Sequence, residues 1–269
     1  MARYTQLGNV SRQLSYFWLM LTLQHITIIG NGKVGQFMER NLSSRFQVTL
    51  VSRDGKTGHS FPQALAELIH KTGLILICVS DQAIKEVSEQ IPHGKIRIAH
   101  VSGATPLEAL SDKHPHRGIW YPLMSFTPDQ YPDIKSIPFC LEATDEDTFT
   151  LLKDLTLAMG ARFHKVDSEQ RKVVHLAAVL AQNFSNHLYE LAFEEMKKAH
   201  LDFDLLKPLL LQSINRLNYN SPADMQTGPA VRKDELTIAR HEKMITNPLT
   251  LEIYRLMTQS IQQKHDPKL

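Results

Sequence analysis

Short apolar runs alternate with amphipathic stretches along the first two thirds of the chain. The runs are short and nearly unbroken, which is typical of parallel strands buried on both faces. They cover residues 25–29, 46–51, 74–79 and 96–101. Residues 33–42 and 61–71, which lie between them, have apolar positions at helical spacing. Because parallel strands need crossover helices, this alternation predicts a doubly wound parallel sheet of α/β class.

The alternation continues to about residue 166 and then stops. Residues 137–142 and 162–166 predict two further strands that flank a helix over 146–159, and Gly160 is its stop signal. From Asp167 the spacing predicts one long helix to about His200, and then helices over 203–218, 234–245 and 248–263. We therefore expect an α/β domain over 24–166 and an all-helical domain over 167–269.

The first 23 residues stand apart from both domains. Residues 16–23 are apolar but too short to span a bilayer, and no small-residue cleavage site follows them. An amphipathic or disordered extension is favoured over an anchor, and Met20 is an alternative start just before the first strand. We assign residues 1–23 no function.

A glycine-rich stretch follows the first apolar run directly. Its residues are Gly30, Asn31, Gly32, Lys33, Val34 and Gly35. If it turns the chain from a strand into a helix, its N–H groups and the helix dipole face an anion, and a dinucleotide pyrophosphate is the natural occupant. We expect Gly30 to allow the tight turn, Gly32 to let the phosphates approach, and Gly35 to let helix and strand pack closely.

The end of the second predicted strand is where a dinucleotide-binding fold contacts the adenosine ribose. Ser52 and Arg53 stand there, with Lys56 close behind, and together they suit the 2′-phosphate of NADP better than the free ribose of NAD. Asp54 instead favours the free ribose of NAD. The structural alternative for this segment is a solvated turn before Gly55. The third predicted strand ends at Val79 and Ser80 follows it, so we expect both residues at the same ligand-binding edge.

Three polar residues interrupt the apolar pattern of the long helix. Lys172 and Asn183 are eleven positions apart and share a face of a regular helix, while His175 lies roughly 60° from Lys172. Carbonyl reduction needs a proton for the nascent alkoxide, so His175 or Lys172 is a candidate acid and Asn183 a candidate orienting group. The structural alternatives are a packed histidine, a solvated lysine and an asparagine that bridges helices.

Arg232 and Asp234 follow a Thr227-Gly228-Pro229 turn and form a second candidate cluster. Arg232 suits a substrate carboxylate, held bidentately. Asp234 either contributes to that site or caps the helix that it precedes.

Composition excludes several other classes of function. Thirty Lys and Arg against 28 Asp and Glu leave a net charge of +2, and no basic block indicates nucleic acid or a membrane surface. Cys78 and Cys140 lie in apolar runs, as buried thiols of a reducing compartment do, so we expect a cytoplasmic protein. The thirteen histidines are scattered without the spacing of a closed metal site, and we expect no metal.

In combination, five motifs resemble the Rossmann-like oxidoreductases with a C-terminal DUF2520 domain, relatives of pyrroline-5-carboxylate reductases and 6-phosphogluconate dehydrogenase-like enzymes. The motifs are residues 29–35, 100–103, 121–126, 175–184 and 227–234. The resemblance covers nearly everything from His25 onward. Two departures concern the substrate pocket: Tyr121 stands where the group often has His, and Lys233 where it often has Gly.

The resemblance implies NADPH-dependent reduction and a homodimer formed through the helical domain. It implies a cofactor contact at Ser102 and places further residues at a small-molecule substrate. These are Ser102, Gly103, Tyr121, Ser125 and Thr227, together with Arg232 and Asp234. The expected substrate is a small 2-oxo acid, with ketopantoate of pantothenate biosynthesis as the sharpest guess, or an imine. A non-catalytic NADP-binding redox sensor is the alternative, and the direction of hydride transfer stays open.

Overall fold

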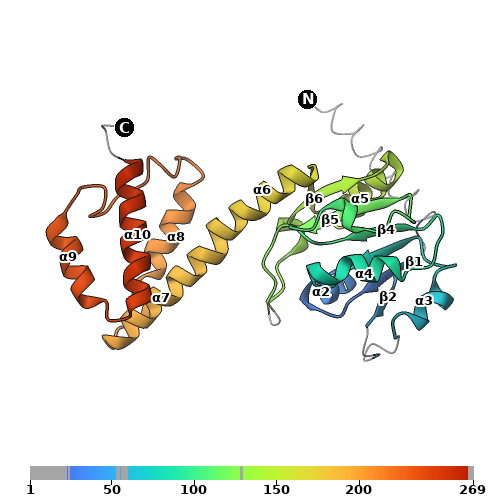
Figure 1. Cartoon of the computed structure of the whole chain (residues 1–269), viewed down its shortest axis with the longest axis horizontal. Coiled ribbons are helices and arrows are strands. Elements are labelled where there is room, and N and C mark those ends of the chain that lie inside the picture. The colour runs from blue at the N-terminus through green and yellow to red at the C-terminus, as the bar shows by residue number, and fades with distance from the viewer. Residues whose placement is uncertain (1–22, 24, 53–54, 56–59, 128–129, 266–269) are drawn as a thin grey trace. The chain divides into compact units, whose positions relative to one another are not determined.

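The computed structural model describes residues 23, 25–52, 55, 60–127 and 130–265. The chain divides into two compact units, Met1–Ala181 and Gln182–Leu269 (Figure 1). The expected extension over 1–23 lies outside the described residues except for Leu23, which is buried.

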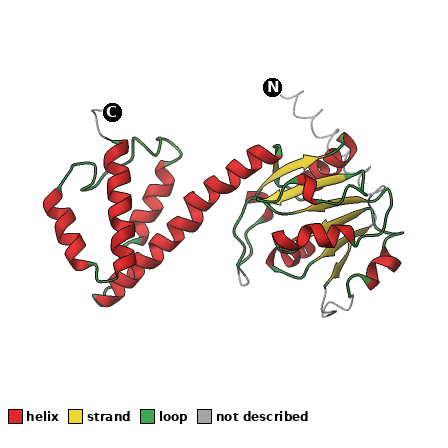
Figure 2. Ribbon diagram, in the orientation of Figure 1, coloured by secondary structure: helices red, strands yellow, loops and turns green. Residues whose placement is uncertain are grey.

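A seven-stranded sheet in the order β2-β1-β3-β4-β5-β6-β7 forms the centre of unit 1 (Figure 2). The strands are β1 (His25–Ile29), β2 (Gln47–Val51), β3 (Leu74–Ile77), β4 (Arg97–His100), β5 (Arg117–Pro122), β6 (Pro138–Ala143) and β7 (Arg162–Lys165). Strands β1 to β5 are parallel to one another. The expected Rossmann-type α/β fold is confirmed.

The sheet is not parallel throughout, however. Strand β6 runs antiparallel to β5, and β7 pairs with β6 in parallel. In its described part, the connection from β5 to β6 contains only the 3-10 turn η3 (Ile134–Ser136) and no crossover helix. Without that helix the chain cannot return to the starting edge, so β6 comes back in the opposite direction.

Helices cover both faces of the sheet because the strands present apolar side chains to both. Ile28 of β1 and Leu76 of β3 belong to the core under α2 (Lys33–Leu42) and α5 (Glu146–Ala158). The next strand residues, Ile29 and Ile77, belong to the opposite core under α3 (Gln63–Leu68) and α4 (Ile84–Glu89). Two buried faces explain why these strands read as continuous apolar runs.

The predicted long helix begins where expected but is not regular. Helix α6 (Ser168–Ala178) opens with a capping box between Asp167 and Gln170. It continues as a π-helix, η4 (Val179–Asn183), into α7 (Phe184–Lys198). A π-helix is wider than an α-helix, so the 100° spacing that would put Lys172 and Asn183 on one face is not kept.

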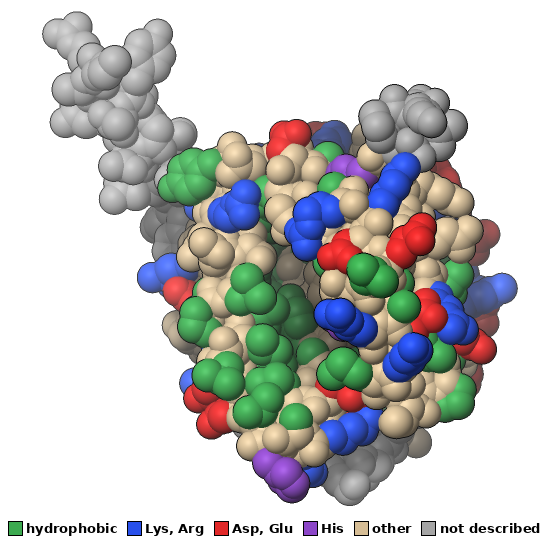
Figure 3. All heavy atoms as spheres, turned by 90° about the vertical axis from the view of Figure 1, so that its left-hand side faces the viewer, with side chains coloured by type: hydrophobic (Ala, Val, Ile, Leu, Met, Phe, Trp, Pro, Cys, Tyr) green, Lys and Arg blue, Asp and Glu red, His purple; other side chains and the backbone are tan. Residues whose placement is uncertain are grey.

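Unit 2 consists of α7, the 3-10 turn η5 (Phe203–Leu205), α8 (Lys207–Arg216), α9 (Glu235–Met244) and α10 (Pro248–Lys264). Among its described residues, Ala230 is the one that is buried. Large apolar side chains remain exposed on all its α-helices, and Figure 3 shows such side chains gathered on the surface. Examples are Phe184, Leu209, Leu236 and Leu256. None of the helices within the described ranges combines the length and the hydropathy needed to cross a bilayer.

Candidate functional site

The glycine turn leaves an open space at the start of α2. Gly30 has φ +116°, and a Cβ there would stand 2.2 Å from the Cys78 carbonyl oxygen and 3.2 Å from Val79 Cγ1. A Cβ on Gly35 would stand 1.9 Å from the Gly30 carbonyl oxygen, whereas a Cβ on Gly32 would meet nothing within 4 Å. Gly30 and Gly35 therefore permit close packing, and Gly32 keeps the approach to the helix clear.

The first turn of α2 suits an anion. Gly32 is the N-cap residue, no side chain caps the helix, and the first turn contains no acidic residue. The leading N–H groups and the positive end of the helix dipole are thus available to a negative ligand. Asn31 and Lys33 are exposed beside this turn, and Val34 is half-buried.

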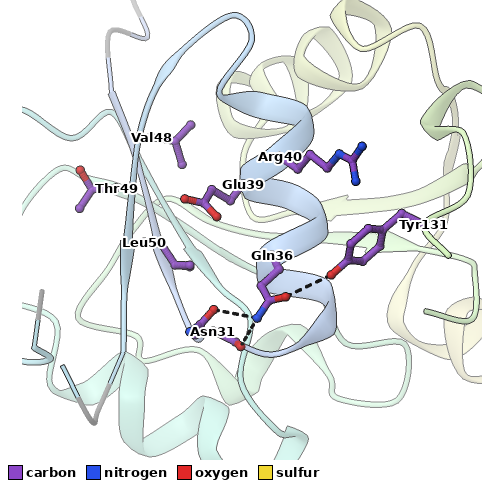
Figure 4. A pocket seen from close by; sticks show the side chains of 8 residues that line it. All are labelled: Asn31, Gln36, Glu39, Arg40, Val48, Thr49, Leu50 and Tyr131. Carbon is purple, nitrogen blue, oxygen red and sulfur yellow. Dashed lines mark hydrogen bonds between the residues drawn. The ribbon is translucent and has the colours of Figure 1, made fainter. Parts of the chain in front are cut away.

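A groove of about 580 Å³ adjoins the turn and is lined by residues of α2, β2 and the connection after β5 (Figure 4). Gln36 links its two walls: its Nε2 donates to the Asn31 carbonyl oxygen at 3.2 Å, and its Oε1 accepts from the Tyr131 hydroxyl at 3.2 Å. The lining consists of Asn31, Gln36, Glu39, Arg40, Val48, Thr49, Leu50 and Tyr131. It includes Asn31 of the expected cofactor site and none of the expected substrate residues.

The expected ribose site is described only in part. Ser52 is buried, forms an isolated parallel bridge with Ser60, and accepts the Phe61 N–H at its carbonyl at 3.0 Å. Arg53, Asp54 and Lys56 lie outside the described residues. At the end of β3, Val79 is half-buried and Ser80 exposed.

The loop after β4 is held by its own polar groups. Ser102 is buried, and its Oγ accepts the Ala104 N–H at 3.2 Å and the Thr105 N–H at 2.9 Å. His100 Nδ1 accepts the Ser102 N–H at 3.1 Å. Burial and, to a smaller extent, the Arg171 charge lower the His100 pKa to about 4, so this ring is neutral near pH 7.

Three expected site residues meet beside this loop. The Tyr121 hydroxyl lies 3.4 Å from His175 Nδ1, and the two rings pack edge to face. Gly103 completes the contact, because a Cβ there would stand 2.6 Å from Tyr121 Cζ and 2.8 Å from His175 Nδ1. Desolvation by burial raises the Tyr121 pKa above its usual range, so the phenol keeps its proton.

The other expected residues of unit 1 are not part of this contact. Lys172 is exposed, and its Nζ donates to the Glu169 carboxylate at 2.6 Å. Ser125 is exposed in the connection after β5. An i,i+3 surface pair such as Lys172 with Glu169 is the ordinary solvated arrangement for a lysine near a helix start.

The expected residues of unit 2 lie on exposed segments. Asn183 ends the π-helix, and Thr227 and Arg232 are exposed. Asp234 caps α9, since its carboxylate accepts the Thr237 N–H at 3.0 Å and the Thr237 hydroxyl at 2.8 Å. These bonds lower the Asp234 pKa, and they favour the capping alternative over the substrate contact.

Sequence analysis missed a charged pair behind the Tyr121–His175 contact. Arg171 is fully buried and forms an ion pair with Glu142 of β6. Arg171 stands four positions before His175, one helical turn away, and that spacing was the available signal. In the described part of the chain, no three His, Cys, Asp or Glu side chains gather so as to hold a metal ion.

Comparison with known proteins agrees with this architecture. Residues 137–261 match DUF2520, a domain of unknown function. A crystal structure described as a putative NADP oxidoreductase from Bacteroides fragilis is 31% identical, with a TM-score of 0.78, over 90% of this chain and 99% of that chain. Curated protein sequences give no match.

Two more distant structures share the fold. A Thermotoga maritima protein is 22% identical, with a TM-score of 0.65, over 90% of this chain and 99% of that one. A reductive aminase from Aspergillus terreus, solved with NADPH and ethyl levulinate, is 14% identical, with a TM-score of 0.64, over 90% of this chain and 95% of that one.

The fold and the glycine turn define a Rossmann-type protein with an uncapped helix start at α2 and a helical C-terminal region. The chain belongs to the family of the Bacteroides protein, the Rossmann-type oxidoreductases with a DUF2520 domain.

Proposed function

We propose that the protein is an NADPH-dependent oxidoreductase that reduces a small 2-oxo acid or an imine, with ketopantoate as the first candidate. The observation that carries the proposal is the Gly103–Tyr121–His175 contact beside the sheet edge that also bears the glycine turn. Strands β1, β4 and β5 are parallel and end at that edge, where α/β folds bind ligands. The description of the Bacteroides relative as a putative NADP oxidoreductase supports the same activity.

The residues at the turn fit a dinucleotide. The open space over Gly32 and the uncapped first turn of α2 suit a pyrophosphate. Ser52 and Arg53 stand at the ribose position of the sequence, where a guanidinium favours the 2′-phosphate of NADPH. When bound, the nicotinamide supplies the hydride of the reduction.

The chain supplies the proton. The Tyr121 hydroxyl is protonated near neutral pH and lies next to His175, so Tyr121 delivers a proton to the substrate oxygen or nitrogen and His175 Nδ1 relays its replacement. His175 therefore keeps its proposed catalytic role. Lys172 is the weaker candidate because it is exposed and paired with Glu169.

Unit 2 carries candidate substrate residues of its own. Arg232 and Thr227 are exposed and suit a substrate carboxylate, and Asn183 suits an orienting role. The exposed apolar residues of its helices support the proposed homodimer, since a unit with so few buried side chains gains stability by covering them. Light scattering tests the dimer, and a monomer at micromolar concentration would contradict it.

Cys78 and Cys140 are free thiols, which supports a cytoplasmic protein.

A screen of NADPH oxidation over 2-oxo acids, ketopantoate included, and cyclic imines tests the function. We expect turnover that falls strongly in His175→Ala while NADPH still binds. Tight NADPH binding without turnover of any substrate would contradict an enzyme and favour the sensor. In Arg53→Asp we expect weaker NADPH binding relative to NADH, and an unchanged ratio would remove Arg53 from the site.

A further inference from the structure

Arg171 is buried more completely than a charged residue near a helix start normally is. Its side chain is 0% exposed, although the residue stands in the first turns of α6. Arg is rarely buried without partners, because removing a charge from water is strongly unfavourable. The partners of this guanidinium therefore indicate what its burial achieves.

The guanidinium joins three segments that are distant in sequence. Nη1 donates to the Glu142 carboxylate of β6, and Nη2 donates to the Thr105 carbonyl oxygen at 2.7 Å. Ser168 adds to the cluster: its hydroxyl donates to Glu142 at 2.9 Å and accepts from Nη2 at 3.2 Å. We call Arg171, Glu142, Ser168 and the Thr105 carbonyl the buried clamp.

Two of the segments held by the clamp carry residues of the proposed site, and the third, β6, pairs with the strand that carries Tyr121. Helix α6 carries His175 one turn after Arg171, and the loop that ends at Thr105 carries Gly103. In the antiparallel pairing of β5 with β6, Ile119 lies opposite Glu142 and Tyr121 opposite Cys140. Since side chains two positions apart share a face of a strand, Glu142 and Tyr121 project from the same face of the sheet.

We propose that Arg171 and Glu142 are positioning residues, which hold His175 and Gly103 against Tyr121 in the geometry needed for proton delivery. This inference rests on the proposed function. A buried ion pair adds little stability compared with well-packed apolar residues, whereas its directed hydrogen bonds fix one arrangement of the groups that it joins. Such an arrangement is needed because a small shift of α6 would separate the Tyr121 hydroxyl from His175 Nδ1. The close approach at Gly103 likewise requires that both rings keep their positions.

The test separates this role from general stabilisation. In Arg171→Met/Glu142→Leu both charges are removed together, so no unpaired buried charge is left to destabilise the fold. We expect a melting temperature and an NADPH affinity close to those of the wild type, with kcat lowered about 100-fold and KM changed far less. Lys198→Gln/Glu195→Gln, which removes the exposed ion pair on α7, is the matched control and should leave kcat unchanged.

A second measurement does not depend on turnover. The imidazole Cε1–Hε1 resonance of His175, assigned by its loss in His175→Asn, should shift in the double variant and not in the control. If the double variant folds with kcat and this resonance unchanged, the positioning role is wrong. If the double variant does not fold, Arg171→Lys, which keeps the charge and loses the bidentate geometry, takes its place: a shifted resonance supports the clamp and an unshifted one overturns it.

The two hypotheses fail in different ways. If the wild-type protein turns over no substrate and Arg171→Met/Glu142→Leu still shifts the His175 resonance, the proposed function is wrong but the clamp holds this pair of side chains. If the wild-type protein is active and the double variant equally so, the clamp is wrong and the function stands.

Discussion

The hydroxyl of Tyr121 lies 3.4 Å from Nδ1 of His175, although 54 positions separate these residues in the chain. Gly103 makes the contact possible, since a Cβ there would stand 2.6 Å from the tyrosine ring. The pair links the end of β5 to α6 and places a protonated phenol beside an imidazole.

Removal of the Tyr121 hydroxyl should slow proton delivery. In Tyr121→Phe we expect kcat to fall about 100-fold, the usual contribution of a positioned acid, with NADPH affinity unchanged. Steady-state kinetics and fluorescence titration with NADPH measure the two effects. Tyr254→Phe is the control, because Tyr254 forms a similar bond to His241 Nδ1, at 2.9 Å, in unit 2. Equal rates in both variants would count against the assignment.

Two glycines of the turn should respond differently to the same substitution. In Gly32→Ala the added methyl group has no atom within 4 Å, so we expect normal stability. We expect NADPH affinity to fall roughly tenfold or more, because the methyl group occupies the space through which the phosphates approach. Gly35→Ala places a Cβ 1.9 Å from a backbone oxygen, and it should cost about 3 kcal/mol or more of unfolding free energy. Urea unfolding and NADPH titration distinguish these effects. A stable Gly35→Ala protein would show that α2 can shift.

His100 should make the protein less stable in mild acid. Its pKa of about 4 in the folded protein is below the ordinary histidine value of 6.5. The unfolded chain therefore binds a proton that the folded one does not, and stability falls as pH falls from 6.5 towards 4. The loss attributable to His100 between pH 7 and pH 5 is about 2 kcal/mol.

Urea unfolding at both pH values, compared with His100→Gln, measures this contribution. Burial also lowers the pKa values of His25 and His114. The unfolding free energy of His100→Gln should therefore still depend on pH, but less steeply than that of the wild type. If the unfolding free energies of the two proteins changed equally between the two pH values, the assignment to His100 would be contradicted.

Asp234 should behave as a helix cap. In Asp234→Asn the residue still caps α9, so we expect the melting temperature and kcat/KM to stay close to wild type. Asp234→Ala removes the bonds to Thr237 and should lower the melting temperature by a few degrees. A large loss of kcat/KM in Asp234→Asn at normal stability would restore the substrate contact.

Local patterns were enough to predict most of the elements. Strand β3 and helix α5 lie within two residues of their predicted bounds, because continuous apolar runs and Gly160 are signals carried by neighbouring residues. The direction of β6 was not predictable in this way. The direction of β6 depends on the path of the connection after β5, and the sequence of that connection shows no helical spacing of apolar residues.

The glycine turn shows what the sequence determined by itself. The spacing of Gly30, Gly32 and Gly35 behind an apolar strand was sufficient to predict a tight turn, close packing and an open approach to the helix, because all three are set within six residues. The candidate chemistry was decided only by tertiary structure. Lys172 and His175 looked equivalent in sequence, yet burial and pairing leave one in solvent and bring the other to Tyr121. Arg171 was overlooked because its partners, Glu142 and Thr105, lie 29 and 66 positions away, and only folding brings such distant groups within hydrogen-bond reach.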